Sequence, residues 1–155
     1  MFLPIQNISS KKLIGLHLEM SLAADRTMEL WRSFMPRRKE INALNTILFS
    51  LQVYPQNYDH SNLSSHFTRW ALAEVEDFDN IPKEMQTFLL PEGKYAVFLH
   101  KGSPSEGYKT FQFIFGSWLP NSGYEIDNRP HFEILGEKYK NNSPDSEEEI
   151  WVPIK

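Results

Sequence analysis

The chain has 155 residues, a formal net charge of −4 and no cysteine. The lack of cysteine excludes disulfide scaffolds, zinc ribbons and thiol nucleophiles, and the mild acidity argues against broad phosphate binding, which needs a dominant basic face. No apolar run approaches the roughly 18 residues of a membrane helix, and no basic region precedes the first apolar residues, as a secretory signal would require. We therefore expect one cytoplasmic domain over residues 1–155, without membrane association.

The first half of the chain combines one helix pattern with three strand patterns. Apolar and polar residues alternate in the first strand, and an apolar stripe marks the helix, which Pro36 ends. The basic residues after the helix suit the negative end of its dipole better than they suit a nucleic-acid patch. The predicted elements are a strand at 12–20, a helix from Ser21 to about Met35, and strands at 47–54 and 66–76.

The second half repeats this plan. Ser103 opens a capping box with Pro104 at the first helical position, and the strand starts and helix caps of the two halves are each 82 residues apart. A short segment at 85–90 joins the halves and adds a candidate edge strand. The predicted elements are a strand at 94–101, a helix from Ser103 to Pro120, strands at 132–135 and 148–154, and a loop at 141–145 between them.

These patterns predict an α+β fold of two βαββ units, about 12–80 and 85–155, related by a pseudo-twofold axis. In such a fold an antiparallel sheet carries two main helices, and the seam between the units leaves a central ligand cleft on the sheet side. On the strand at 66–76, Trp70 and Leu72 share one face, and Arg69 and Ala71 share the other. We expect the Ala71 face to be the helix-covered core and Trp70 to face the cleft.

Five motifs in order resemble the GyrI-like, AraC-type effector-binding family of bacterial domains. They are IPKEM (81–85), LPEGKYAVF (90–98), WLPNSGY (118–124), PHFEIL (130–135) and IWVPI (150–154). The resemblance covers the chain from about Lys12 onward. It implies two βαββ units around a cleft that binds apolar, often cationic or aromatic compounds, with a carboxylate at its floor.

The resemblance assigns the floor carboxylate to Glu133 and a stacking position to Trp70. Leu135 departs from the family pattern, because many relatives carry an aromatic residue there. From the strand and helix patterns we add Phe98 as a candidate cleft residue, and Trp118 fits either the core or the cleft rim. The complete set of expected ligand-binding residues is Glu133, Trp70, Phe98, Trp118, Leu72 and Leu135.

Glu133 carries the predicted chemistry. In an aromatic cleft, desolvation raises the pKa of a carboxyl group, and a cation or a nearby arginine lowers it. A lipophilic cation would relieve the cost of burying the charge and would gain cation–π contacts. The leading hypothesis is thus a domain that senses or sequesters small apolar, cationic or aromatic compounds.

Two alternatives belong to other classes. Some stand-alone relatives resemble hydrolases of strained-ring genotoxic compounds, in which case Glu133 would be the catalytic general base. Relatives that inhibit gyrase suggest a protein partner, for which the acidic run at 145–149 is a candidate contact. Because the first strand begins at Lys12, we expect a stand-alone member without direct nucleic-acid binding. The five histidines lack metal-ligand spacing, so we expect no metal and no cofactor.

Overall fold

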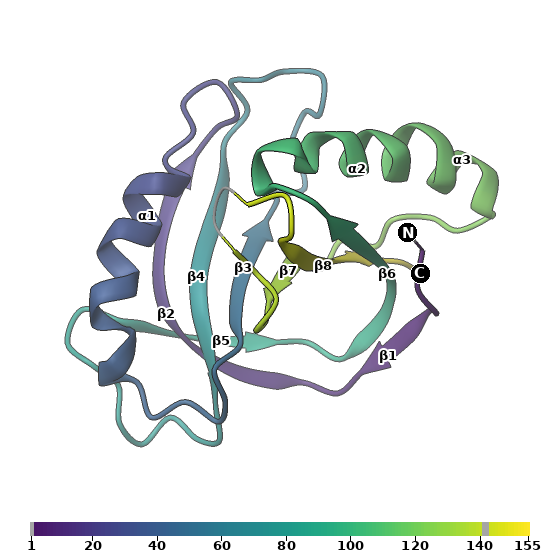
Figure 1. Ribbon diagram of the computed structural model, residues 1–155. Helices are drawn as coiled ribbons and strands as arrows, with labels where there is room; N and C mark the ends of the chain where they lie inside the picture. Colours follow the sequence, from purple (N-terminus) through teal and green to yellow (C-terminus); the bar gives the residue numbers. More distant parts are fainter. Residues whose placement is uncertain (1, 141–142) are drawn as a thin grey trace.

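In residues 2–140 and 143–155, which the computed structural model describes, eight strands form one curled antiparallel sheet (Figure 1). Its strand order is β5-β2-β4-β3-β7-β8-β6-β1. The strands are β1 (Gln6–Ile8), β2 (Lys11–Met20), β3 (Leu48–Val53), β4 (Phe67–Val75), β5 (Gln86–Leu90), β6 (Gly93–Lys101), β7 (His131–Leu135) and β8 (Glu147–Pro153).

Two helical segments pack on the sheet, one on each half (Figure 1). The first is α1 (Thr27–Phe34), continued by the 3-10 turn η1 (Met35–Glu40). The second comprises η2 (Pro104–Glu106), α2 (Gly107–Phe113), the π-helical turn η3 (Ile114–Trp118) and α3 (Leu119–Ser122). None of the helices in the described part of the chain has the length and apolar character needed to cross a bilayer.

The predicted duplicated α+β fold is confirmed. The halves meet at the antiparallel pair β3–β7, where Ser50 lies opposite Glu133. On either side of this pair the order is the same, since β4 and β2 follow β3 as β8 and β6 follow β7. The sheet therefore places equivalent strands of the two halves symmetrically about its centre.

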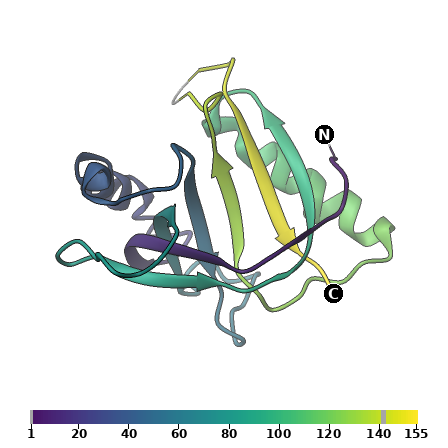
Figure 2. The same cartoon turned by 90° about the horizontal axis from the view of Figure 1, so that it is seen from below.

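The two short edge strands are exchanged between the halves. The strand β1 directly precedes β2 in sequence but pairs with β6, and β5 directly precedes β6 but pairs with β2. Figure 2 shows the N-terminal segment running beside the strands of the second half. Main-chain hydrogen bonds thus join the halves at both outer edges as well as at the central seam.

The two faces of the sheet are filled differently. The face away from the helices carries one continuous core, which consists of Leu13, Phe49, Leu51, Trp70, Leu72, Leu90, Tyr95, Val97, Phe132 and Trp151. The helical face carries two separate cores. In the first half, Leu30 and Phe34 of α1 pack on β2 and β4. In the second half, Ile114 packs on β6 and β8. The central strands between these two cores are left uncovered by either helix.

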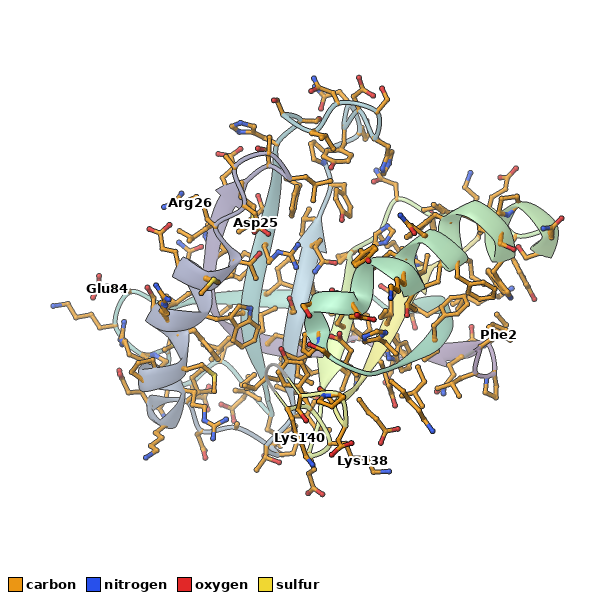
Figure 3. All side chains as sticks on the ribbon, turned by 45° about the horizontal axis from the view of Figure 1, so that its top comes forward. Phe2, Asp25, Arg26, Glu84, Lys138 and Lys140 are labelled. Carbon is orange, nitrogen blue, oxygen red and sulfur yellow. The ribbon has the colours of Figure 1, made fainter. Side chains whose placement is uncertain are left out.

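Two helix boundaries differ from the sequence-based predictions, and the short strand β1 was not predicted. The first α-helix starts at Thr27 rather than Ser21, because Asp25 accepts the Thr27 amide (2.9 Å) while Ser21 caps only a turn at Ala24. Figure 3 shows Asp25 and Arg26 beside this helix start. The second helical segment continues past Pro120, which lies in the first turn of α3, where a missing N–H is tolerated. In the predicted loop at 141–145, Asn141 and Asn142 lie outside the described residues.

Candidate ligand-binding site

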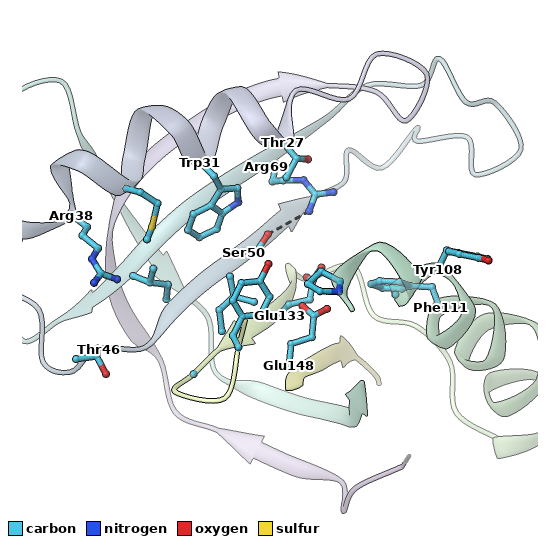
Figure 4. A pocket seen from close by; sticks show the side chains of 17 residues that line it. Thr27, Trp31, Arg38, Thr46, Ser50, Arg69, Tyr108, Phe111, Glu133 and Glu148 are labelled. Carbon is cyan, nitrogen blue, oxygen red and sulfur yellow. Dashed lines mark hydrogen bonds between the residues drawn. The ribbon is translucent and has the colours of Figure 1, made fainter. Parts of the chain in front are cut away.

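A cavity of about 510 Å³ lies between the two helices, on the uncovered centre of the sheet (Figure 4). We call it the first cavity. Side chains of β3, β4, β7 and β8 form its floor, and α1 and α2 form its walls. The lining residues used below are Trp31, Leu48, Ser50, Arg69, Phe111, Glu133, Leu135, Tyr139 and Glu148. Its size falls within the range of sites for small organic ligands.

The position of the cavity corrects one expectation. The seam between the halves was predicted to open on the face away from the helices, but that face is filled by the continuous core. The cavity instead lies on the helical face, where each helix packs only on its own half. The gap between two separately packed helices leaves a hollow above the seam.

Glu133 lies at the centre of this floor. Its carboxylate Oε2 accepts a hydrogen bond from the side-chain amide of Gln52 at 3.0 Å. Burial raises the pKa of Glu133, while the positive charge of Arg69 and the hydrogen bond from Gln52 lower it. Glu133 is thus a half-buried carboxyl group whose charge is only partly compensated by its neighbours.

A second carboxyl group, Glu148 on β8, faces the same cavity (Figure 4). Burial, together with the negative charge of Glu133, raises its pKa to about 7. The phenol of Tyr139 also lines the cavity, and burial and both glutamates raise the pKa of this phenol. Among the described residues, neither Glu133 nor Glu148 forms an ion pair with lysine, arginine or histidine. The cavity therefore holds two carboxyl groups that have no ion-pair partner among the described residues.

Arg69 is the nearest source of positive charge in the floor. Its Nη1 donates to the Ser50 hydroxyl at 3.4 Å, and its guanidinium lies 5.5 Å from the ring centre of Phe67. Its Nε is buried without a hydrogen-bond partner. Arg69 therefore acts on Glu133 through the electrostatic field rather than through a direct bond.

Aromatic rings form the walls of the first cavity. Trp31 of α1 lies on one side and Phe111 of α2 on the other (Figure 4). The indole of Trp31 packs edge-on against Phe34, with ring centres 5.6 Å apart, and Phe111 stacks parallel to Phe115 at 6.4 Å. These contacts hold the walls in place above the two carboxylates.

The structure brings together only some of the residues expected at the site. Glu133 and Leu135 line the first cavity. Trp70 and Leu72 belong to the continuous core on the opposite face, where Trp70 packs against His17 and Phe88. The predicted direction of Trp70 is therefore wrong. Ala71 and Arg69 share the face toward the helices. Ala71 belongs to the core under α1, whereas Arg69 lies in the floor of the first cavity.

Phe98 and Trp118 lie together under the second helical segment. Their rings are 5.0 Å apart, and both contact the ring of Phe2. Phe98 is fully buried in the core between β6 and this segment, and Trp118 packs at its edge. The structure thus places both residues in the packing of the second half, away from Glu133.

Sequence reasoning missed several cavity residues that have a recognisable signal. Ser50 and Gln52 alternate with apolar residues in an otherwise buried strand, and Arg69 interrupts an apolar face. Buried polar residues at alternating positions mark a face that lines a cavity rather than a core. The acidic run at 145–149 was a candidate contact for a protein partner, but Glu148 within it lines the first cavity.

No three histidine, aspartate or glutamate side chains gather to form a metal site within residues 2–140 and 143–155. The charged groups of the cavity are two carboxylates and two arginines, Arg69 in the floor and the exposed Arg38 at the rim. This set is suited to holding a polar or charged organic molecule by electrostatics.

Comparison with known families agrees with this geometry. Residues 4–154 match the family model of the integron-associated effector binding protein, Cass2. The chain belongs to this effector-binding family. The resemblance drawn from the five motifs is thereby confirmed, and small-molecule binding is the general function that family membership supports.

One curated relative and two solved structures show the extent of the similarity. The transcriptional regulator BrlR of Pseudomonas aeruginosa is 29% identical over 142 residues, which cover 91% of this chain. The chain spans about half of that regulator, since the match covers 51% of it.

Both structures match nearly the whole chain. SAV2435, solved bound to tetraphenylphosphonium, has a TM-score of 0.77 at 17% identity, over 100% of this chain and 94% of its own. The integron cassette protein VCH_CASS2 of Vibrio cholerae has a TM-score of 0.69 at 15% identity, over 98% of this chain and 95% of its own. At these identities the likeness establishes a shared fold.

Proposed function

We propose that the chain binds a lipophilic organic cation in the first cavity, with the positive centre facing Glu133 and Glu148 and apolar groups packed on Trp31 and Phe111. The observation that carries this proposal is the pair of half-buried carboxylates without an ion-pair partner, enclosed by aromatic rings. The tetraphenylphosphonium bound by SAV2435 is a compound of this chemical class.

The physical argument rests on the cost of burying charge. Two carboxylates in one hollow repel each other and are partly removed from water, which disfavours their ionised forms. A cation placed between them lowers that cost, and its apolar surface gains from burial against the rings. A neutral or anionic compound of the same shape gains the apolar contacts alone. Charge is therefore the basis of selectivity.

Tetraphenylphosphonium and tetraphenylborate provide a direct test, because they have nearly the same shape and opposite charges. Titration followed by intrinsic tryptophan fluorescence is expected to show binding of the phosphonium at least about tenfold tighter than binding of the borate. The substitution Glu133→Gln is expected to remove most of that difference. Glu137→Gln changes an exposed glutamate outside the first cavity and serves as the matched control. Equal binding of the two ions would contradict the proposal.

One observation favours a second candidate function, hydrolysis of a bound electrophile. A carboxyl group with a pKa of about 7, such as Glu148, is suited to general-base catalysis at neutral pH. Its test is turnover, measured as product formed from cyclopropane-containing electrophiles, with Glu148→Gln and Glu133→Gln as comparisons. Product formation equal to that in buffer alone would exclude this reaction for that class of compound.

A further inference from the structure

A second cavity, of about 340 Å³, adjoins the first. Phe111 of α2 and Glu133 of β7 line both cavities, so the two meet between these side chains. Glu133 is also joined to Gln52, which lines only the second cavity. The carboxylate therefore stands at a junction rather than at the end of a closed pocket.

The three central strands run through both cavities on the same face of the sheet. Every second residue of a strand shares a face, at a spacing of about 7 Å. Moving along each strand, one such step leads from the first cavity into the second. These steps are from Ser50 to Gln52 on β3, from Glu133, which lines both cavities, to His131 on β7, and from Glu148 to Ile150 on β8. The two cavities are therefore consecutive parts of one elongated track.

The second cavity differs from the first in its charge. Its described lining holds no lysine or arginine, and Glu133 is its only acidic residue. Burial lowers the pKa of His131 to about 4, so its imidazole is neutral at neutral pH. The rings of Tyr54 and His131 lie edge-to-face with centres 5.1 Å apart.

These rings make the second cavity a receptor for flat apolar groups. Phe111 and Phe115 contribute two more rings, which lie parallel to each other. Aromatic surfaces without an arginine or lysine in the lining favour a planar aromatic group over a charged one. Glu133 at the junction is the one carboxyl group among the described residues that line this cavity, and it favours a cationic centre there.

We infer that the second cavity is a separate subsite for a planar aromatic group, so that the ligand class is an elongated aryl cation whose charge lies at Glu133 and whose ends occupy the two cavities. This inference rests on the proposed function, which places the positive charge of the ligand beside Glu133. The new part is the elongated shape of the ligand and the residues of the second cavity that select for it.

Two variants test the subsite through its own residues. Leu119→Trp fills the second cavity from α3. Phe115→Ala removes one of its rings at a position 37% exposed to solvent, so the variant is expected to fold even where Leu119→Trp does not. Phe113→Ala is the matched control, because Phe113 is 45% exposed on the same helical segment and does not line the second cavity.

The probes are 4-(4-dimethylaminostyryl)-N-methylpyridinium, an elongated cation with two rings, and benzyltrimethylammonium, a compact cation with one. Leu119→Trp and Phe115→Ala are expected to weaken binding of the elongated probe by about tenfold and of the compact probe by less than about threefold. Phe113→Ala is expected to leave the affinity for both probes within about twofold. An equal loss for both probes in the first two variants would overturn the subsite.

Methyl NMR spectra locate the elongated probe. Methyl signals of Leu135 report on the first cavity and those of Leu119 and Val152 on the second, while Leu72 lies on the opposite face as a reference. The elongated probe is expected to shift the signals of both cavities and to leave Leu72 unchanged. Shifts confined to Leu135, with Glu133-dependent binding of tetraphenylphosphonium intact, would overturn the second subsite alone. Failure of every cation to bind the unmodified protein would overturn the proposed function and this inference together.

Discussion

Gln52 and Glu133 form a hydrogen bond of 3.0 Å across the seam between the halves, the amide of Gln52 donating to the carboxylate. Gln52 is buried, and its strand partner in the sheet is His131. The bond fixes one oxygen of Glu133 and leaves the other free to face the first cavity. It also favours the ionised form of the carboxyl group, which a cationic ligand requires.

Replacing Gln52 by Met is expected to weaken cation binding at neutral pH. The hydrogen bond lowers the pKa of Glu133, so its loss raises that pKa further and leaves more of the carboxyl group protonated. We expect about a tenfold loss of affinity for tetraphenylphosphonium at pH 7, with recovery as the pH rises. Titrations between pH 6 and pH 9 measure this. Gln86→Met, at an exposed glutamine, is the control, and a loss independent of pH would contradict the explanation.

Arg69→Met is expected to strengthen cation binding at high pH. The guanidinium repels a cationic ligand and partly compensates Glu133, so its removal leaves the full carboxylate charge to the ligand. The same substitution raises the pKa of Glu133, and the gain therefore appears only above that pKa. We expect about threefold to tenfold tighter binding of tetraphenylphosphonium at pH 9. Arg38→Met, at the exposed rim, is expected to change the affinity by less than about twofold.

Glu148→Gln is expected to stabilise the protein at neutral and alkaline pH. The folded-state pKa of Glu148 is about 7 against an ordinary value of 4.5, so the folded state binds more protons between these values. The free energy of unfolding therefore falls as the pH rises from 4.5 to 7, by at most about 3 kcal/mol. The substitution removes this decrease in the free energy of unfolding. Urea unfolding is expected to show that Glu148→Gln raises the free energy of unfolding at pH 8 and leaves it unchanged at pH 4, where Glu148 is already protonated.

His131 has the opposite effect on the pH dependence of stability over part of this range, because the free energy of unfolding rises with pH where His131 loses its proton only in the unfolded state. Burial lowers its pKa from 6.5 to about 4, so the unfolded state binds more protons between these values. Its contribution to stability is complete above pH 6.5 and is lost as the pH falls toward 4. In the Glu148→Gln variant this acid-side loss is expected to remain, which distinguishes the two groups. Glu137→Gln, an exposed change, is expected to alter neither slope.

Arg129→Met is expected to destabilise the fold by about 2–4 kcal/mol. The guanidinium donates to the carbonyl oxygens of Lys94 (2.6 Å) and Ile154 (3.0 Å) and to Asp127 (2.7 Å), and it lies 4.7 Å from the ring centre of Tyr95. Its loss leaves the Ile154 carbonyl without this donor, whereas the Lys94 carbonyl keeps the amide of Ile154. Urea unfolding measures the change.

Lys155→Met is the control for Arg129→Met, because it removes only an exposed ion pair with Glu125. The free energy of unfolding of this control is expected to change by less than about 1 kcal/mol. Equal stability of the Arg129→Met variant and the unmodified protein would show that the hydrogen bonds of Arg129 to Lys94 and Ile154 do not stabilise the fold.

Local periodicity was sufficient to predict β2, β3, β4, β6, β7 and β8, and the segment of β5 was predicted as a candidate edge strand. The three-residue strand β1 was missed, because it is too short and too exposed to show a pattern. The matching order of elements in the two halves then predicted the duplicated fold. The sequence pattern could not predict which face of the sheet opens into a cavity. Either Trp70 or Arg69 could face the cavity, since both residues occur on the buried and on the exposed face of half-buried strands. That choice depends on the distance between two helices, which is a property of the assembled sheet.

The site was predictable only where a motif marked it. Glu133 was found through the PHFEIL motif, and Leu135 followed from the same strand. Glu148 was not predicted as a site residue, because an acidic run at the start of a strand is ordinarily exposed to solvent. The pairing of β8 with β7 is what places Glu148 beside the cavity. The sequence pattern that identifies the face of the two cavities is the alternation of Ser50 and Gln52 within apolar β3, since Ser50 lines the first cavity and Gln52 the second.

The pairing of β1 and β5 with the opposite halves restricts how a ligand enters the protein. A motion that separated the halves would have to break the backbone hydrogen bonds of the central pair β3–β7 and of both edge pairs, β1–β6 and β5–β2. Such a rupture costs far more than shifting a few rings. A ligand is therefore expected to enter the first cavity between α1 and α2 from the helical side, while the strands beneath stay paired as a rigid platform.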